Sequence, residues 1–307
     1  MDNKKLAIIL GVLIAIFAIS QFTGTNKSRS FDPNVLSFDD SSVDEIEITI
    51  PGNTSSSLSK TGDQWNVSDG NQVFLADGFA VSSLLGELKS IKAKKIAARS
   101  EEKAAKFETN VEAATHIVVK SGGKVLADVN VGRFSFDQQS RQPISYIKKA
   151  KEDETYLVQS FLAMSTKKDF NSLRDKSFLS IDKSQIQTLE LTTPSFNASL
   201  SPFGNLWQTV DGIAIDSTAM EKYLDGLNDL KGVTFGSNAS GGLSDYSLSA
   251  TLKDGKVVTV EALRTEENKF VISSSSTPQN MFESDENGLF KKVFRDLEDL
   301  LVVTGDL

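Results

Sequence analysis

Gly62-Asp63-Gln64-Trp65 indicates how this chain of 307 residues is built, because a matching stretch recurs as Gly204-Asn205-Leu206-Trp207. The first stretch follows strand-like alternation at residues 46–51 and precedes helical spacing at residues 81–91. The second stretch has the same kind of neighbours, at residues 189–194 and 218–230. The only two tryptophans of the chain therefore stand at matching places, which predicts two tandem units of similar fold.

Strands are expected at the start of each unit and again after its first helix. Ile46, Ile48 and Ile50 alternate with polar residues, the pattern of a strand with one buried face. Turn residues at 121–123 and at 253–255 separate further strand-like runs, so each unit is expected to contain a second hairpin.

Helices are expected to cover these sheets. Apolar residues at helical spacing predict amphipathic helices at residues 81–91 and 289–301, the second of which would close the chain. Three lysines would suit the negative end of the first helix dipole: Lys92, Lys94 and Lys95. This order predicts an α+β fold, in which a covering helix lies on a mostly antiparallel sheet in each unit. We expect the units to span residues 43–178 and 179–307.

The N-terminus has the pattern of a membrane segment. Residues 6–22 form an uncharged apolar run after Lys4 and Lys5, and a helix over this run would be about 25 Å long, at the short end for a bilayer. Residues 1–22 are therefore expected to be a transmembrane anchor or, if cleavage follows Ser20, a signal peptide. The flanking lysines favour a single-pass protein of the cell membrane with most of the chain in the periplasm. Residues 23–42 are polar and are expected to form a linker.

Composition excludes several classes of function. Hydrophobic residues make up 39% and charged residues 24% of the chain, which is typical of a globular protein. The net charge is -8 and the basic residues are scattered, so nucleic-acid binding is not expected. Without cysteine there can be no disulfide, thiolate nucleophile or cysteine-ligated metal.

No motif predicts a catalytic, cofactor-binding or metal-binding residue. His116 is the only histidine, it falls in a predicted strand, and no Gly-x-Ser-x-Gly motif accompanies it. Residues 283–288 begin like a calcium-binding loop, but Phe294 stands where such a loop needs a bidentate glutamate. The chain is therefore expected not to be an enzyme and to hold no cofactor.

The remaining candidates for function are surfaces. Phe134 and Phe136 in the first unit, and Met281 and Phe282 in the second, are aromatic or sulfur-containing residues that could form an interaction surface or pack into the core. A groove between the two units is a further candidate. Trp65 and Trp207 lie on short predicted strands beside a helix, so each is expected to mark the core of its unit.

The apolar N-terminus, the Gly-x-x-Trp stretches and the passage Leu173-Arg174-Asp175-Lys176 together resemble a bacterial family of domains of unknown function, number 4340. The resemblance covers most of residues 43–300. It implies an N-terminal membrane segment and an extracytoplasmic domain. It also implies an auxiliary role beside ABC-2 type transporters, including gliding-motility-associated systems, and it carries over no catalytic residues.

We therefore expect a membrane-tethered extracytoplasmic interaction protein that serves an ABC-type export or gliding complex and has a permease or its accessory subunit as partner. The alternative is a ligand- or polysaccharide-binding module that uses the groove between the units. A secreted hydrolase is the third possibility.

Overall fold

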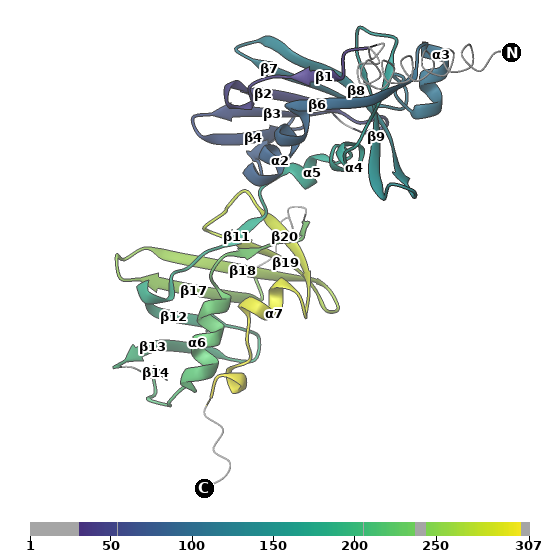
Figure 1. The fold of residues 1–307 in the computed structure, drawn as a ribbon. Coiled ribbons are helices and arrows are strands. Elements are labelled where there is room, and N and C mark those ends of the chain that lie inside the picture. The colour runs from purple at the N-terminus through teal and green to yellow at the C-terminus, as the bar shows by residue number, and fades with distance from the viewer. Residues whose placement is uncertain (1–30, 54, 205, 237–243, 302–307) are drawn as a thin grey trace, which may run out of the picture. The chain divides into compact units, whose positions relative to one another are not determined.

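A computed structural model describes residues 31–53, 55–204, 206–236 and 244–301. It divides the chain into two compact units, Met1–Leu173 and Arg174–Leu307. The expected boundary after residue 178 lies slightly too late, because Phe178 is fully buried in the core of the second unit. Both units consist mostly of antiparallel sheet with few helices (Figure 1), as expected for the predicted α+β fold.

The first unit contains a ten-stranded sheet in which all neighbouring strands are antiparallel. From one edge to the other, its strands are β1 (Asn34–Ser37), β6 (Ser90–Ala98), β10 (Thr155–Val158), β9 (Gln142–Lys149), β8 (Lys124–Asp137), β7 (Thr115–Ser121), β2 (Glu45–Thr49), β3 (Ser56–Thr61), β4 (Gln64–Ser68) and β5 (Val73–Leu75).

Strand β1 corrects the predicted linker at residues 23–42. Val35 and Leu36 are buried in the core, and the strand pairs with β6. Residues 34–37 therefore belong to the folded unit, although too few apolar residues precede them for the alternation to be recognised. The part of the linker before residue 31, together with the predicted anchor or signal peptide at residues 1–22, lies outside the described residues.

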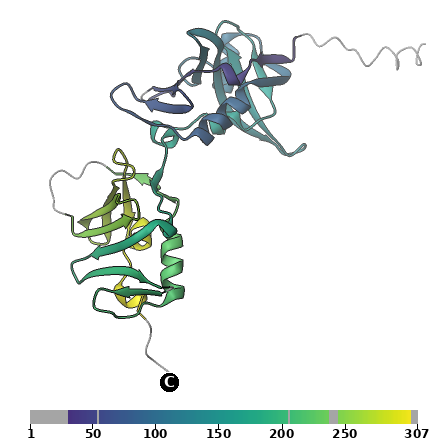
Figure 2. The same cartoon turned by 90° about the vertical axis from the view of Figure 1, so that its left-hand side faces the viewer.

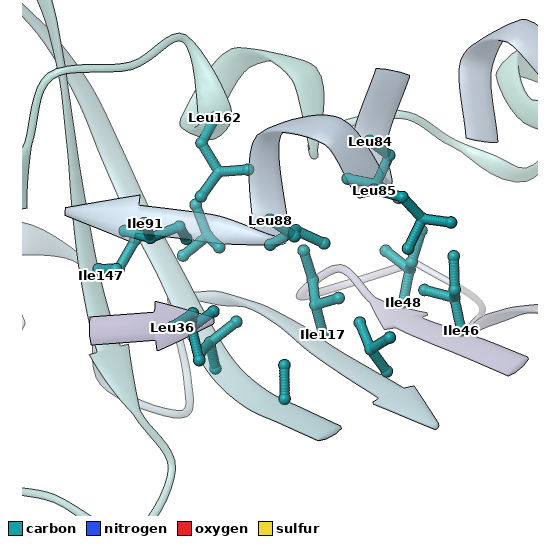
Figure 3. Close-up of a cluster of buried hydrophobic side chains, with 14 of the residues drawn as sticks. Leu36, Ile46, Ile48, Leu84, Leu85, Leu88, Ile91, Ile117, Ile147 and Leu162 are labelled. Atoms are coloured by element: carbon teal, nitrogen blue, oxygen red, sulfur yellow. The ribbon is translucent and has the colours of Figure 1, made fainter. Parts of the chain in front are cut away.

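Helix α2 (Gly78–Leu88) covers one face of this sheet. Asp77 caps the helix by accepting hydrogen bonds from the backbone amides of Phe79 and Ala80. Its buried side chains face those of the sheet, as Figure 3 shows for Leu84, Leu85 and Leu88 over Ile46, Ile48 and Ile117. These side chains are 6% exposed or less, so the hydrophobic effect holds the helix on the sheet.

The helix ends earlier than its apolar spacing predicts. Ile91 fits the helical period after Leu88, but it lies on β6, where buried Ile91 and Ala93 alternate with exposed residues. The lysines expected at the helix end are exposed on this strand instead: Lys92, Lys94 and Lys95. The helix dipole therefore does not explain their position.

Several short helices complete the first unit. Helix α3 (Glu101–Ala104) and the 3-10 helix η2 (Ala105–Phe107) lie between β6 and β7. Helices α4 (Leu162–Ser165) and α5 (Phe170–Leu173) follow β10. Their buried residues Leu162, Ala163 and Leu173 join the core under α2.

The second unit has an eight-stranded antiparallel sheet and a separate antiparallel pair. The sheet runs β14 (Leu206–Thr209), β13 (Asn197–Phe203), β12 (Ile186–Thr192), β17 (Tyr246–Leu252), β18 (Val257–Glu266), β19 (Lys269–Ser274), β20 (Met281–Asp285) and β16 (Thr234–Phe235), and the pair is β11 (Ser177–Leu179) with β15 (Leu230–Lys231).

Helix α6 (Ser217–Gly226) lies along one face of this sheet (Figure 2) and buries Met220, Tyr223 and Leu224. The predicted closing helix at residues 289–301 is not continuous. It divides into α7 (Leu289–Val293) and the 3-10 helix η4 (Leu297–Asp299). Phe294 ends α7 in an extended conformation, and its buried ring packs near Tyr246, with the ring centroids 5.6 Å apart. The helix ends at this residue because the extended backbone places the Phe294 ring in the core.

Gly232 allows β15 and β16 to pass close to the core of the second unit. A Cβ added at this glycine would lie 2.0 Å from the ring of Phe282, which is fully buried. Gly232→Ala should therefore displace the ring and lower the free energy of unfolding by about 2–3 kcal/mol. The urea midpoint reported by Trp207, in a Trp65→Phe background, measures this loss.

Gly226→Ala is the matched control, because a Cβ at this helical glycine meets nothing within 4 Å. It should leave stability unchanged or raise it by up to about 1 kcal/mol. Equal losses in the two variants would contradict the proposed clash.

Candidate functional site

The two tryptophans take part in the cores of their units, but neither is fully buried. Trp65 lies on β4, the second strand from the edge of its sheet, and Trp207 lies on the edge strand β14; each packs against the core cluster of its unit. These contacts suit a structural role, and the partial exposure of both residues shows that they fill the core less completely than the sequence predicts.

Met281 and Phe282 do not form an exposed surface. Phe282 is fully buried, its ring stacks on that of Phe235 at 4.8 Å between centroids, and Phe178 meets it edge-on at 5.9 Å. Successive residues of a strand point to opposite faces, so only Met281 remains partly accessible. Phe282 is therefore a core residue, the second of the two alternatives that the sequence leaves open.

Phe134 and Phe136 do contribute to an exposed apolar surface. They stand two residues apart on β8, and therefore on the same face. The ring of Phe134 stacks on that of Phe161, with centroids 6.1 Å apart and planes at 14°. Met164 lies one helical turn beyond Phe161, at the spacing that places two side chains side by side. We call these four residues, Phe134, Phe136, Phe161 and Met164, the apolar patch.

Three of these four side chains are at least half exposed: Phe136 at 50%, Phe161 at 54% and Met164 at 57%. The patch is held in place by buried Ser145 on β9. Its hydroxyl donates to the carbonyl of Ser160 at 2.9 Å and accepts from the amide of Ala163 at 2.9 Å, which fixes the start of α4 on the sheet. The exposure of the patch is therefore built into the fold, because these hydrogen bonds hold α4 against β8 and β9.

His116 has a carboxylate partner but no nucleophile. Its Nε2 lies 2.8 Å from Oδ1 of Asp128, on a part of the sheet where the His116 side chain is 42% exposed. Within the described part of the chain, the His116 side chain has no other hydrogen-bond partner, and no serine hydroxyl completes a triad.

Neighbouring positions of β2 and β7 carry a network of ion pairs. The ammonium of Lys120 donates to the carboxylate of Glu47 at 2.7 Å and to that of Glu45 at 3.0 Å. The hydrogen bond from Lys120 holds the pKa of Glu47 below its usual value, and the two carboxylates raise the pKa of Lys120. This network joins two strands and needs no ligand.

Residues 31–53, 55–204, 206–236 and 244–301 contain no cluster of three or more carboxylate or histidine side chains that could hold a metal ion. The acidic run at residues 283–288, which begins like a calcium loop, lies on β20 and in the turn after it. None of the helices in these residues is both long and apolar enough to cross a membrane.

A groove of about 650 Å³ lies within the second unit. Its lining mixes the apolar Val233, Phe270 and Leu289 with polar residues of β18, β19 and β20. Glu266 and Lys269 on its wall form an ion pair of 2.6 Å. No sequence motif marks this groove, because its residues come from separate strands and from α7.

A family model described as Domain of unknown function (DUF4340) matches residues 69–251, which is more than half of the chain. The chain belongs to this family. The matched DUF4340 region begins in the first unit and ends in the second, and it includes the whole apolar patch. No curated protein and no solved structure matches the chain.

The Lys120 network should make the stability of this DUF4340 protein depend on pH. The pKa of Glu47 is lowered in the folded state, so its contribution is present above the pKa of the unfolded chain, near 4.5, and is lost as pH falls through the folded value. Glu47→Gln should therefore reduce the loss of stability on acidification. Urea midpoints at pH 7 and at pH values below 4.5 measure this difference.

Glu190→Gln is the control for this experiment, because Glu190 on β12 has no ion-pair partner among the described residues. It should keep the pH dependence of the wild type. A Glu47→Gln protein whose midpoint changes with pH as steeply as that of the wild type would contradict the prediction.

Proposed function

We propose that this protein is a membrane-tethered, extracytoplasmic interaction protein that serves an ABC-type export or gliding-associated complex without catalysing a reaction. The apolar patch is the observation that carries this proposal. Clustered exposed aromatic side chains are uncommon on a soluble surface that has no partner. The apolar N-terminal run at residues 6–22 and the transporter association implied by the family resemblance support the membrane-protein partner.

Aromatic residues and methionine suit such a partner site. Both are enriched in the centres of protein interfaces, where they bury a large area. The stacked Phe134 and Phe161 are already held in one arrangement, so their binding to a partner would cost little side-chain entropy. We therefore propose that the patch receives an apolar segment of a multi-span permease or of its accessory subunit.

We further propose that the chain is a tandem repeat of one scaffold. In this repeat, strands β2–β4 correspond to β12–β14, and strands β7–β10 correspond to β17–β20. The pairing order of these strands supports the proposal. So do the helix caps, since Asp77 and Asp216 each accept from the amide three residues later. Leu36-Ser37-Phe38-Asp39 and Leu179-Ser180-Ile181-Asp182 also lead into the 3-10 helices η1 (Asp40–Ser42) and η3 (Lys183–Gln185), each capped by its aspartate.

The proposed function predicts that Phe136→Ser with Phe161→Ser abolishes capture of the partner. Full-length tagged protein, extracted from its own bacterial membranes in mild detergent, should bring down an ABC-type permease identified by mass spectrometry. The double variant should lose the permease but remain in the membrane fraction and keep the unfolding midpoint of the wild type, because both side chains are about half exposed.

Phe203→Ser is the matched control, because Phe203 is 68% exposed on β13 and lies outside the patch. It should capture the permease as the wild type does. Recovery of the permease by the patch variant at the level of the wild type, or its absence from every wild-type capture, would refute the proposal.

The second candidate function is a ligand- or polysaccharide-binding module, and the groove of about 650 Å³ favours it. Pockets of this size with apolar walls and a few polar groups accept small molecules. A thermal shift with soluble glycans that is lost in Phe270→Ala or Leu289→Ala, while the permease is not captured, would favour this function over the first.

A further inference from the structure

A second groove, of about 530 Å³, lies in the second unit between α6 and residues 291–300. Three basic residues line it, Lys222 on α6, Lys291 on α7 and Arg295 after α7. Two aspartates, Asp216 and Asp299, complete its charged lining, so the formal charge of the lining is positive in a protein whose net charge is -8.

The three basic side chains have no partner in the described residues. None forms a hydrogen bond or an ion pair, and the Nε of Arg295 is buried without an acceptor. Most buried polar groups in folded proteins do have a hydrogen-bond partner. By contrast, Lys183 binds two carboxylates of the same helix α6, at 3.0 Å for Glu221 and 2.7 Å for Asp225. These two carboxylates of α6 therefore pair with Lys183, and Lys222 on the same helix has no ion-pair partner among the described residues.

The aspartates do not neutralise the groove either. Asp216 accepts from the backbone amide of Ala219 at 2.7 Å and serves as the cap of α6. No ion pair joins Asp299 to a described residue, although it lies four residues after Arg295. The lining thus keeps a net positive formal charge, and its like charges repel one another less when an anion lies between them.

The fold does not require these cations. In the proposed tandem repeat, α6 takes the place of α2, and α7 follows β20 as α4 follows β10. Lys222 is the sixth residue of α6 and Lys291 the third of α7, whereas the same positions of α2 and α4 are Ser83 and Met164. The back wall of the groove is fixed without them, because the hydroxyl of buried Tyr223 donates to the carbonyl of Val293 at 2.6 Å. The Tyr223–Val293 hydrogen bond therefore holds the back of the groove without any contribution from the basic residues.

We infer that this groove binds a phosphate ester, with Lys222, Lys291 and Arg295 holding the phosphate and Asp299 accepting a hydrogen bond from a hydroxyl group of the ligand. A guanidinium with two ammonium groups offers more donors than a single carboxylate can accept, and it matches the charged oxygens of a phosphate ester better. The phosphate can belong to a soluble ester or to a lipid headgroup, since both present negatively charged phosphate oxygens.

Calorimetry on the full-length protein in a neutral detergent tests this inference with two probes. Glycerol 3-phosphate represents the soluble ester, and dihexanoyl phosphatidylglycerol, below its micelle concentration, represents the lipid. At low ionic strength at least one probe should bind with a Kd of about 1 mM or lower, and binding should weaken as salt is added. Binding of glycerol 3-phosphate would identify the soluble source, and binding of the lipid alone would identify the headgroup.

Lys291→Gln and Arg295→Gln should each weaken binding about tenfold, because each removes a charge-assisted hydrogen bond. Lys292→Gln is the matched control, since Lys292 is the exposed neighbour of Lys291 on α7 and does not line the groove. Lys291→Gln also keeps the test valid if Arg295→Gln impairs folding, because Lys291 is exposed. Failure of both probes to bind up to about 10 mM, or equal binding by the Lys291→Gln and Lys292→Gln proteins, would overturn the inference.

Discussion

The apolar face of an open antiparallel sheet must be covered, and the rest of this structure depends on how each covering helix is held. In the first unit, the amide of Asp77 at the start of α2 donates to the carbonyl of Leu173 at 2.8 Å. In the second unit, the amide of Asp216 at the start of α6 donates to the carbonyl of Leu300 at 2.9 Å. Each helix is thus tied to the last described residues of its unit, so a unit closes only after nearly all of its described sequence is present.

Sequence periodicity predicts an element correctly where its apolar spacing fits only a helix or only a strand. The alternation at Ile46 and Ile48 correctly indicates β2, and the glycines of the second hairpins lie in turns between strands. The pattern fails where two periods overlap, since Ile91 fits both the helix before it and the strand that contains it. It also fails at Phe294, where packing of the ring against Tyr246 overrides the helical spacing.

In the candidate surfaces, too, the sequence identifies residues that are neighbours on one strand but misses residues that only tertiary packing brings together. Phe134 and Phe136 can be identified from the sequence because they are two aromatic residues on one face of a strand. Phe161 and Met164 cannot, because they reach the same surface only when α4 packs on β8 and β9. The basic groove is hidden for the same reason, since Lys222 and Arg295 are far apart in the sequence and meet through the packing of α6 beside α7.

The adjacent residues Leu173 and Arg174 join the two units, and each is buried in its own unit. Leu173 is 1% exposed in the first unit. Arg174 is 8% exposed in the second, where it lies over the ring of Phe235 and donates to Asn280 at 3.2 Å. No spacer separates them, so a protease would have to unwind part of a unit before it reached this peptide bond. Tension applied to one unit would also reach the other through this peptide bond.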